Sequence, residues 1–150
     1  MIEPDALFHL SSTLAMVGWL ALLILSRYDI VTRLIIPVGV CGLLGFLYLY
    51  LIINHMGGTE GGFGSLSDVA LLFQNPNMLL AGWVHYLAFD LFIGCWEIRD
   101  ARRHRISIIL TIPALFMTFM FGPVGLIAYL MIRFIRTRSV VLDEHQILPD

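Results

Sequence analysis

Residues 77–105 read NMLLAGWVHYLAFDLFIGCWEIRDARRHR and decide how the chain folds. The part from 77 to 98 is long and apolar enough to cross a bilayer core, which takes about 20 helical residues. His85, Asp90 and Glu97 nevertheless fall inside this span. Ionisable groups are costly in hydrocarbon, so such residues in a membrane span predict a functional site.

The composition is that of an integral membrane protein. Of the 150 residues, 59% are apolar and 13% charged, against about 45–50% and about 25% in soluble domains. The net charge of -2 argues against a nucleic-acid partner. The start of the chain has no basic segment and no obvious cleavage site, so we expect a mature bacterial-type protein in the inner membrane or a thylakoid-type membrane.

Four apolar segments predict an all-α integral membrane bundle of four transmembrane helices in a single domain. Backbone groups in hydrocarbon must satisfy their own hydrogen bonds, so each segment should be helical. The domain covers residues 1–150, with expected spans at 6–26, 34–54, 77–98 and 106–132 and a tail at 133–150.

Prolines and glycines predict where these helices begin, kink or break. Pro37 falls in the first turn of the second span, where its missing N–H costs little. Gly122 and Pro123 predict a kink in the fourth span, or its division into two short helices. In the second case a re-entrant turn would bring the chain back to the side from which it came.

A short amphipathic helix is expected between the second and third spans. Residues 57–64 hold five glycines and predict a flexible loop. Residues 65–75 then have a helical apolar stripe, with Ser65 as a plausible N-cap and Asp68 in the first turn. This helix is expected to lie in the membrane interface or across the mouth of the bundle.

The arginines indicate the orientation in the membrane, because cytoplasmic connections are rich in basic residues. Six of the nine arginines flank or fill the first and third connections, and three lie in the tail, at Arg133, Arg136 and Arg138. Four crossings would separate the tail from the other six. A re-entrant turn at Gly122 would remove this conflict.

Helical spacing places the polar residues of the third span on two stripes. One stripe holds Tyr86, Asp90 and Glu97; the other, about 120–140° away, holds His85, Phe89 and Trp96. Asp90 lies near the middle of the span and must pair, face a wet cavity or stay protonated. The alternative to a functional role is that Asp90 only makes a structural hydrogen bond between helices.

The residues nearer the arginines have simpler interpretations. Glu97 is close enough to the helix end to pair with Arg102 or to reach the interface. Asp100 and His104 are interpreted as solvent-facing.

The other end of the bundle carries a weaker polar pattern. Two histidines and a carboxylate could converge there and hold a metal, from the set Asn54, His55, Glu60 and His85. These residues have no tight ligand spacing such as HExxH, so we predict no metal and no cofactor. We retain Asn54, His55 and Glu60 as candidate substrate-binding residues.

Aromatic residues surround the third span and suggest a ligand. Most belong to lipid or helix packing. A groove lined by aromatics and methionines would also accept a long apolar molecule entering from the bilayer. The candidate binding residues on this span are Trp83, Phe89 and Trp96.

Three long motifs resemble the abscisic-acid-deficient-four-like membrane proteins. They are GFGSLSDVALLFQNPNMLLAG at 62–82, GWVHYLAFDLFIGCWEIRDARR at 82–103 and TIPALFMTFMFGPVGLIAYLMIR at 111–133. Plant members of that family are associated with making neoxanthin from violaxanthin. The resemblance implies a bacterial-type member that works on a carotenoid-like or other isoprenoid lipid.

The implied reaction is an isomerisation that opens an epoxide and removes a carbon-bound proton. It exchanges no electrons, so it needs no redox cofactor. It needs one acid and one base. The resemblance and the helix geometry together suggest Asp90 as the acid and His85 as the base, with Glu97 or Tyr86 orienting or relaying.

Two other functions remain open. A non-catalytic carotenoid- or isoprenoid-binding or assembly protein would bind pigment without turning it over. A transporter is the third candidate, although four helices are few for one unless the chain forms a homo-oligomer, and inverted repeats are not apparent.

Overall fold

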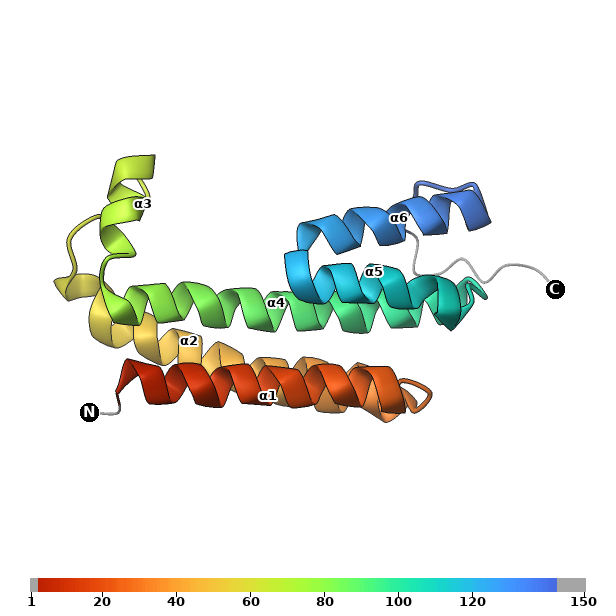
Figure 1. The fold of residues 1–150 in the computed structure, drawn as a ribbon, viewed down its shortest axis with the longest axis horizontal. Coiled ribbons are helices and arrows are strands. Elements are labelled where there is room, and N and C mark those ends of the chain that lie inside the picture. Colours follow the sequence, from red (N-terminus) through yellow and green to blue (C-terminus); the bar gives the residue numbers. More distant parts are fainter. Residues whose placement is uncertain (1–2, 143–150) are drawn as a thin grey trace.

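The computed structural model describes residues 3–142, and every regular element among them is a helix (Figure 1). In chain order the elements are α1 (Pro4–Leu25), the π-helix η1 (Val31–Val40), α2 (Cys41–His55), the 3₁₀ turn η2 (Met56–Gly58), α3 (Leu66–Leu72), α4 (Pro76–Arg103), α5 (Ile108–Phe121) and α6 (Pro123–Thr137).

Three helical segments of the described chain are long and apolar enough to cross a membrane. They are Pro4–Leu25, Val31–Gly58 and Pro76–Arg103. The central one is α4, which packs against α1 and α2 along one side and against α5 on another. The prediction of four transmembrane helices is therefore wrong by one.

The expected span 106–132 is two helices folded back on each other. Its break lies at Gly122, whose φ of +48° and ψ of -99° suit glycine, and Pro123 opens the next helix. Figure 1 shows α6 returning alongside α5, and the two helices pack closely. The 14 residues of α5 extend about 21 Å, too short for a full crossing. We call this unit the α5–α6 hairpin.

The hairpin brings the end of the described chain back to the arginine-bearing side. In Figure 1 the ends of α1, α4 and α6 lie together, opposite the start of α1 and the glycine-rich loop. All nine arginines therefore gather at one end of the molecule. The conflict in the arginine count disappears, because the tail arginines lie at the same end as the other six, as the positive-inside rule expects of one side of a membrane.

The second span begins earlier than its sequence suggests. It continues without interruption from η1 into α2, so Pro37 lies inside a helix and not in its first turn. Here the Cys41 N–H bonds to the Ile36 carbonyl, five residues back. The wider π-helix has room for the proline ring, which in an α-helix clashes with the carbonyl four residues earlier.

The short helix between the second and third spans is present as α3. The Ser65 hydroxyl accepts a hydrogen bond from the Asp68 N–H at 3.1 Å, which confirms Ser65 as the N-cap. Figure 1 shows α3 standing away from the bundle at the start of α4. The Phe73 ring packs over Gly82 of α4, where a Cβ would lie 3.3 Å from it.

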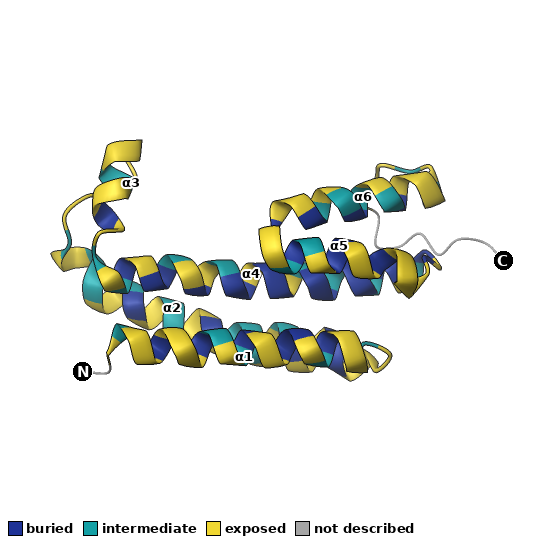
Figure 2. Ribbon diagram, in the orientation of Figure 1, coloured by how far each residue is buried: buried dark blue, intermediate teal, exposed yellow. Residues whose placement is uncertain are grey.

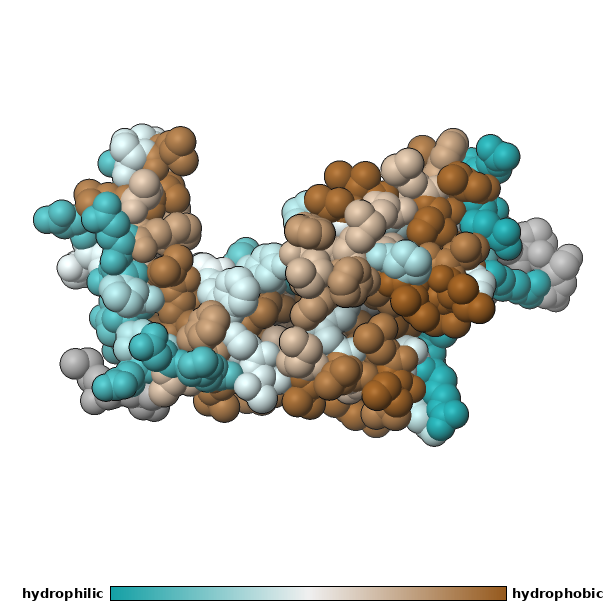
Figure 3. Space-filling model, in the orientation of Figure 1, coloured by the Kyte–Doolittle hydropathy of each residue, from teal (hydrophilic) through white to brown (hydrophobic). Residues whose placement is uncertain are grey.

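Burial and hydropathy match a protein embedded in lipid. Buried residues face inward between the helices, while exposed residues cover the outside (Figure 2). Much of that outside is apolar: Figure 3 shows brown residues over much of one face, interrupted by a paler area, with hydrophilic teal residues at the two ends. Large exposed apolar residues of the protein include Leu10, Ile24, Phe46, Ile53 and Ile109.

Candidate functional site

The candidate site is centred on Asp90, near the middle of the 28-residue α4. Its side chain is 9% exposed, and its Oδ2 is buried with no hydrogen-bond partner among the described residues. The carboxyl faces the turn of the α5–α6 hairpin. A Cβ built on Gly122 would lie 2.7 Å from Asp90 Oδ1, so only glycine allows this approach.

Tyr86 lies one helical turn before Asp90 and on the same face of α4. Its hydroxyl donates a hydrogen bond to the Phe119 carbonyl at 3.1 Å, which ties α4 to the end of α5. The Tyr86 ring stacks on Trp83 with centroids 5.4 Å apart. The Trp83 indole N–H in turn donates to Ser12 Oγ at 3.0 Å. Tyr86 and Trp83 therefore connect α4 to α5 and α1.

These residues line a cleft of about 200 Å³ between α1, α4 and the end of α5. The cleft is mostly apolar, and Asp90 is the one carboxyl-bearing residue among the described residues that line it. The residues around it are Ser12, Ala15, Met16, Trp19, Trp83, Tyr86, Leu87, Asp90, Phe119 and Met120.

Two further apolar grooves adjoin this cleft. One, of about 250 Å³, shares Met16, Trp19 and Phe119 with it and runs between α1 and α5. The other, of about 290 Å³, shares Trp83 and runs toward the start of α1. Together they follow α1 from Pro4 to Leu23, a length of about 28 Å. The shape suits a long apolar molecule more than a compact polar one.

Glu97 lies on the same stripe of α4, two turns beyond Asp90. It is completely buried, and its Oε1 accepts a hydrogen bond from Thr118 Oγ1 at 2.8 Å. Its Oε2 has no hydrogen-bond partner among the described residues. The expected pairing with Arg102 is not found, because that guanidinium bonds to Asp29 Oδ1 at 2.8 Å and to Thr32 Oγ1 at 3.0 Å.

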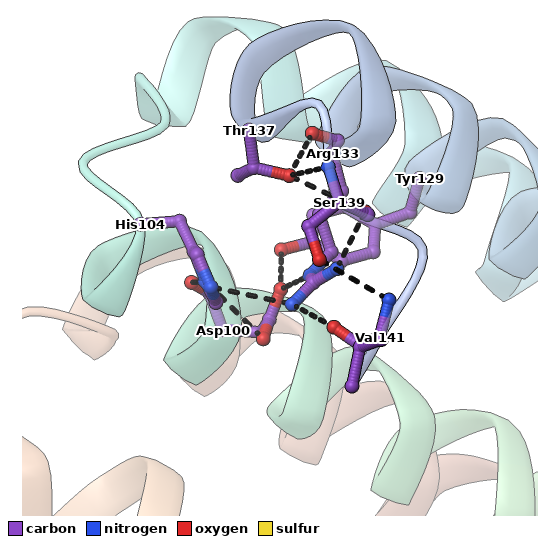
Figure 4. A network of polar contacts seen from close by, with 7 residues as sticks. All are labelled: Asp100, His104, Tyr129, Arg133, Thr137, Ser139 and Val141. Carbon is purple, nitrogen blue, oxygen red and sulfur yellow. Dashed lines mark hydrogen bonds and ion pairs between the residues drawn. The ribbon is translucent and has the colours of Figure 1, made fainter. Parts of the chain in front are cut away.

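A buried ion pair holds the far end of the hairpin against α4 (Figure 4). Arg133 of α6, 2% exposed, donates from Nε to Asp100 Oδ2 at 2.8 Å. The same oxygen accepts a hydrogen bond from the Tyr129 hydroxyl at 2.7 Å. Arg133 also donates to the carbonyls of Ser139 and Val141, at 3.2 and 3.0 Å. This cluster fastens α6 and the following segment to α4.

Asp100 and His104 are therefore buried, and the interpretation of both as solvent-facing is wrong. They are 4% and 7% exposed. His104 Nε2 lies 3.2 Å from Arg133 Nη2. Because the guanidinium can only donate, His104 Nε2 accepts this hydrogen bond. The proton of the ring is then on Nδ1, which donates to the backbone carbonyl of Asp100 at 2.9 Å. The feature of the sequence that indicates this cluster is Arg133, because it places a charged residue within the mostly apolar helix α6.

The model of the ABA DEFICIENT 4-like family matches residues 6–129. The chain belongs to this family. The match extends from α1 into α6 and includes Asp90, Glu97 and the hairpin turn at Gly122. No curated protein and no solved structure matches the chain in two further comparisons.

In this ABA DEFICIENT 4-like protein, His85 is not part of the Asp90 cleft. The His85 side chain is exposed and stacks on Phe89 at 4.5 Å between ring centroids, with Tyr48 of α2 at 5.7 Å. Phe89 itself borders a separate cleft beside α2. Five residues of α-helix turn by about 140°, so His85 and Asp90 point to different faces of α4.

Trp96 also lies outside the cleft. Its ring meets the Tyr129 ring edge-on at 5.5 Å and packs between α4 and α6. Trp83 is thus the one aromatic of the three predicted binding residues that lines the Asp90 cleft.

The four polar residues that could converge at the other end of the bundle, Asn54, His55, Glu60 and His85, do not all line one pocket in this family member. Asn54 and His55 line a pocket of about 470 Å³ with Glu3 and Asn77, at the end opposite the arginines. Glu60 is exposed on the glycine-rich loop and is not among the residues of that pocket. Within residues 3–142, no three His, Cys, Asp or Glu residues are grouped so as to hold a metal ion.

Proposed function

We propose that this protein is a membrane isomerase that acts on a carotenoid-like or other isoprenoid lipid by acid/base chemistry. One observation carries the proposal: a buried carboxyl, Asp90, has an oxygen without a hydrogen-bond partner among residues 3–142 and borders an aromatic cleft between helices apolar enough to cross a membrane. A polar group kept in such a place costs free energy, so it needs a purpose. We place the protein in a bacterial inner membrane or a thylakoid-type membrane.

The lining of the cleft and its two adjoining grooves supports this substrate class. The walls are aromatic, aliphatic and methionine side chains, which favour an apolar chain over a charged solute. Their combined length of about 28 Å along α1 suits an extended isoprenoid. A substrate could enter from the hydrocarbon, because the grooves lie at the outer surface of the bundle.

A single carboxyl is enough for the proton chemistry. With an epoxide as the model substrate, Asp90 in its protonated form donates its proton to the epoxide oxygen as one C–O bond breaks. A carbocation forms, paired with the carboxylate. The carboxylate then removes a proton from the neighbouring carbon, which gives an unsaturated alcohol and restores the protonated acid. No electrons and no atoms are gained or lost, so the substrate is isomerised.

The aromatic walls are suited to the charged intermediate. Trp19, Trp83 and Tyr86 all line the cleft that contains Asp90. Their ring faces attract a cation by about 0.5–2 kcal/mol each, more when water is excluded. In this scheme Tyr86 also positions the cleft through its bond to the Phe119 carbonyl. His85, on another face of α4, has no part in it.

The second candidate is a protein that binds or assembles isoprenoid pigments without changing them. The contact between Asp90 and Gly122 favours it, because the carboxylate lies at the amino end of α6. A negative charge stabilises that end of a helix by about 0.3–1 kcal/mol. In this case Asp90 would stabilise the fold, and the cleft would only bind.

Turnover by purified protein separates the two candidates. The protein in nanodiscs is incubated with epoxycarotenoids and with bacterial carotenoids, and the products are separated by chromatography. Asp90→Asn should lower turnover by about 100-fold or more, while Asp29→Asn, an exposed carboxyl at the arginine end, should leave it unchanged. Equal turnover in wild type and Asp90→Asn would contradict the catalytic role. Bound pigment without turnover would favour the second candidate.

A further inference from the structure

Glu97 has a chemical capacity that the proposed reaction leaves unused. It is completely buried, one carboxyl oxygen is bonded to Thr118, and the other has no hydrogen-bond partner among residues 3–142. A purely structural acceptor for one hydroxyl could be an amide or a carbonyl. An ionisable group in this position is a costlier choice.

We propose that Glu97 is a proton-relay residue that connects Asp90 with the arginine-bearing end of the molecule. The inference rests on the proposed use of Asp90 as a proton donor. Glu97 touches no substrate; it sets how fast the Asp90 proton exchanges with water, while the proposed reaction itself returns a proton from the substrate to Asp90.

The placement of the two carboxyls supports this connection. They lie seven residues apart on the same face of α4, about 10 Å along the helix axis. Both are covered by the α5–α6 hairpin, Asp90 by Gly122 and Glu97 by Thr118. Gly125 packs against Thr118 so closely that a Cβ there would lie 2.2 Å from Oγ1. The Thr118 hydroxyl therefore lies directly against α6, three residues after the turn that meets Asp90.

Polar groups continue from Glu97 toward the arginine end. Asp100 lies three residues further on the same face, about 4.5 Å along the axis. It accepts hydrogen bonds from Tyr129 and Arg133, and His104 lies beside it with Nδ1 at 3.4 Å from Oδ1. Arg133 continues the connection to the carbonyls of the segment after α6.

This line of polar groups runs beneath the hairpin, whereas much of the hairpin's outer surface is apolar. Exposed residues there include Ile109, Phe116, Phe121, Ile127 and Ile135. Asp90, Glu97 and Asp100 thus follow one another along one face of α4 under the hairpin, with Glu97 in the middle.

Infrared spectroscopy of the protein in nanodiscs tests the relay without any substrate. Protonated carboxyls give C=O stretching bands, which Asp90→Asn and Glu97→Gln assign by their loss. After transfer to deuterated water, the Asp90 band shifts as its proton exchanges. Glu97→Gln keeps an acceptor for Thr118 but cannot carry the proton, so exchange at Asp90 should slow on the order of 100-fold. Thr118→Val, which keeps Glu97, should shift the Glu97 band.

Two results would overturn the relay: an unchanged exchange rate at Asp90 in Glu97→Gln, or no protonated-carboxyl band lost in that variant. Asp29→Asn is the matched control and should alter neither band nor rate. If Glu97→Gln does not fold, Thr118→Val decides, because an unshifted Glu97 band and unchanged exchange would also contradict the proposal. Slow exchange in Glu97→Gln together with full turnover by Asp90→Asn would support the proton route and remove the proposed catalytic role.

Discussion

Asp90 of α4 and Gly122 at the hairpin turn are in direct contact. A Cβ on Gly122 would lie 2.7 Å from Asp90 Oδ1 and 3.2 Å from its Cγ, so the carboxyl fills the space of a side chain at position 122. Gly122 also has a positive φ of +48°. The residue that reverses the chain thus also makes room for the buried acid.

Replacing Gly122 by alanine should destabilise the protein by about 1–3 kcal/mol, because it adds backbone strain and a clash with Asp90. Thermal unfolding of the purified protein in detergent measures this loss. Gly42→Ala in α2 is the matched control, since its added Cβ meets nothing within 4 Å. Equal melting temperatures for the two variants would mean that the turn is not built as described.

Breaking the buried Arg133–Asp100 pair should be more costly. Arg133→Met leaves the Asp100 carboxylate buried without its cation, and such a change costs about 3–5 kcal/mol. The double variant Arg133→Met with Asp100→Asn should recover much of the loss, because Asn keeps an acceptor for Tyr129 and carries no charge. Additive losses in this double-mutant cycle would show that the two residues do not act as a pair.

Three crossings with a re-entrant hairpin place the glycine-rich loop and the end of α6 on opposite sides of the membrane. Single cysteines are introduced as Gly62→Cys or Val140→Cys in a background with Cys41→Ser and Cys95→Ala. A membrane-impermeant maleimide should label position 62 from outside intact cells, and position 140 only after permeabilisation. Labelling of both positions from one side would indicate four crossings.

The face of α4 could be predicted from the sequence, because the helical period fixes which residues share a stripe. Asp90 and Glu97 do meet the same partner, the α5–α6 hairpin. The Ser65 cap was predicted for a similar reason, since it depends on residues three positions apart. The separation of His85 from Asp90 also agrees with helical spacing, which puts them on different stripes, and it argues against the expected pairing of the two as base and acid.

The hairpin's direction depends on tertiary contacts, and sequence spacing does not define those. Gly122 and Pro123 indicate an interruption, but a kink and a reversal have the same local signature. The reversal is supported by the pairing of Arg133 with Asp100, 33 residues apart in the chain. Without that contact, Asp100 and His104 resemble ordinary polar residues at a helix end.

The proposed function requires that the Asp90 carboxyl carries a proton and is reached from the lipid through the aromatic cleft. Carbodiimides react with such carboxyls to form stable N-acylureas, which mass spectrometry locates. In membranes, a lipophilic carbodiimide should modify Asp90, and a water-soluble one should leave it unmodified. Failure of the lipophilic reagent to modify Asp90, or equal modification by both reagents, would contradict the account.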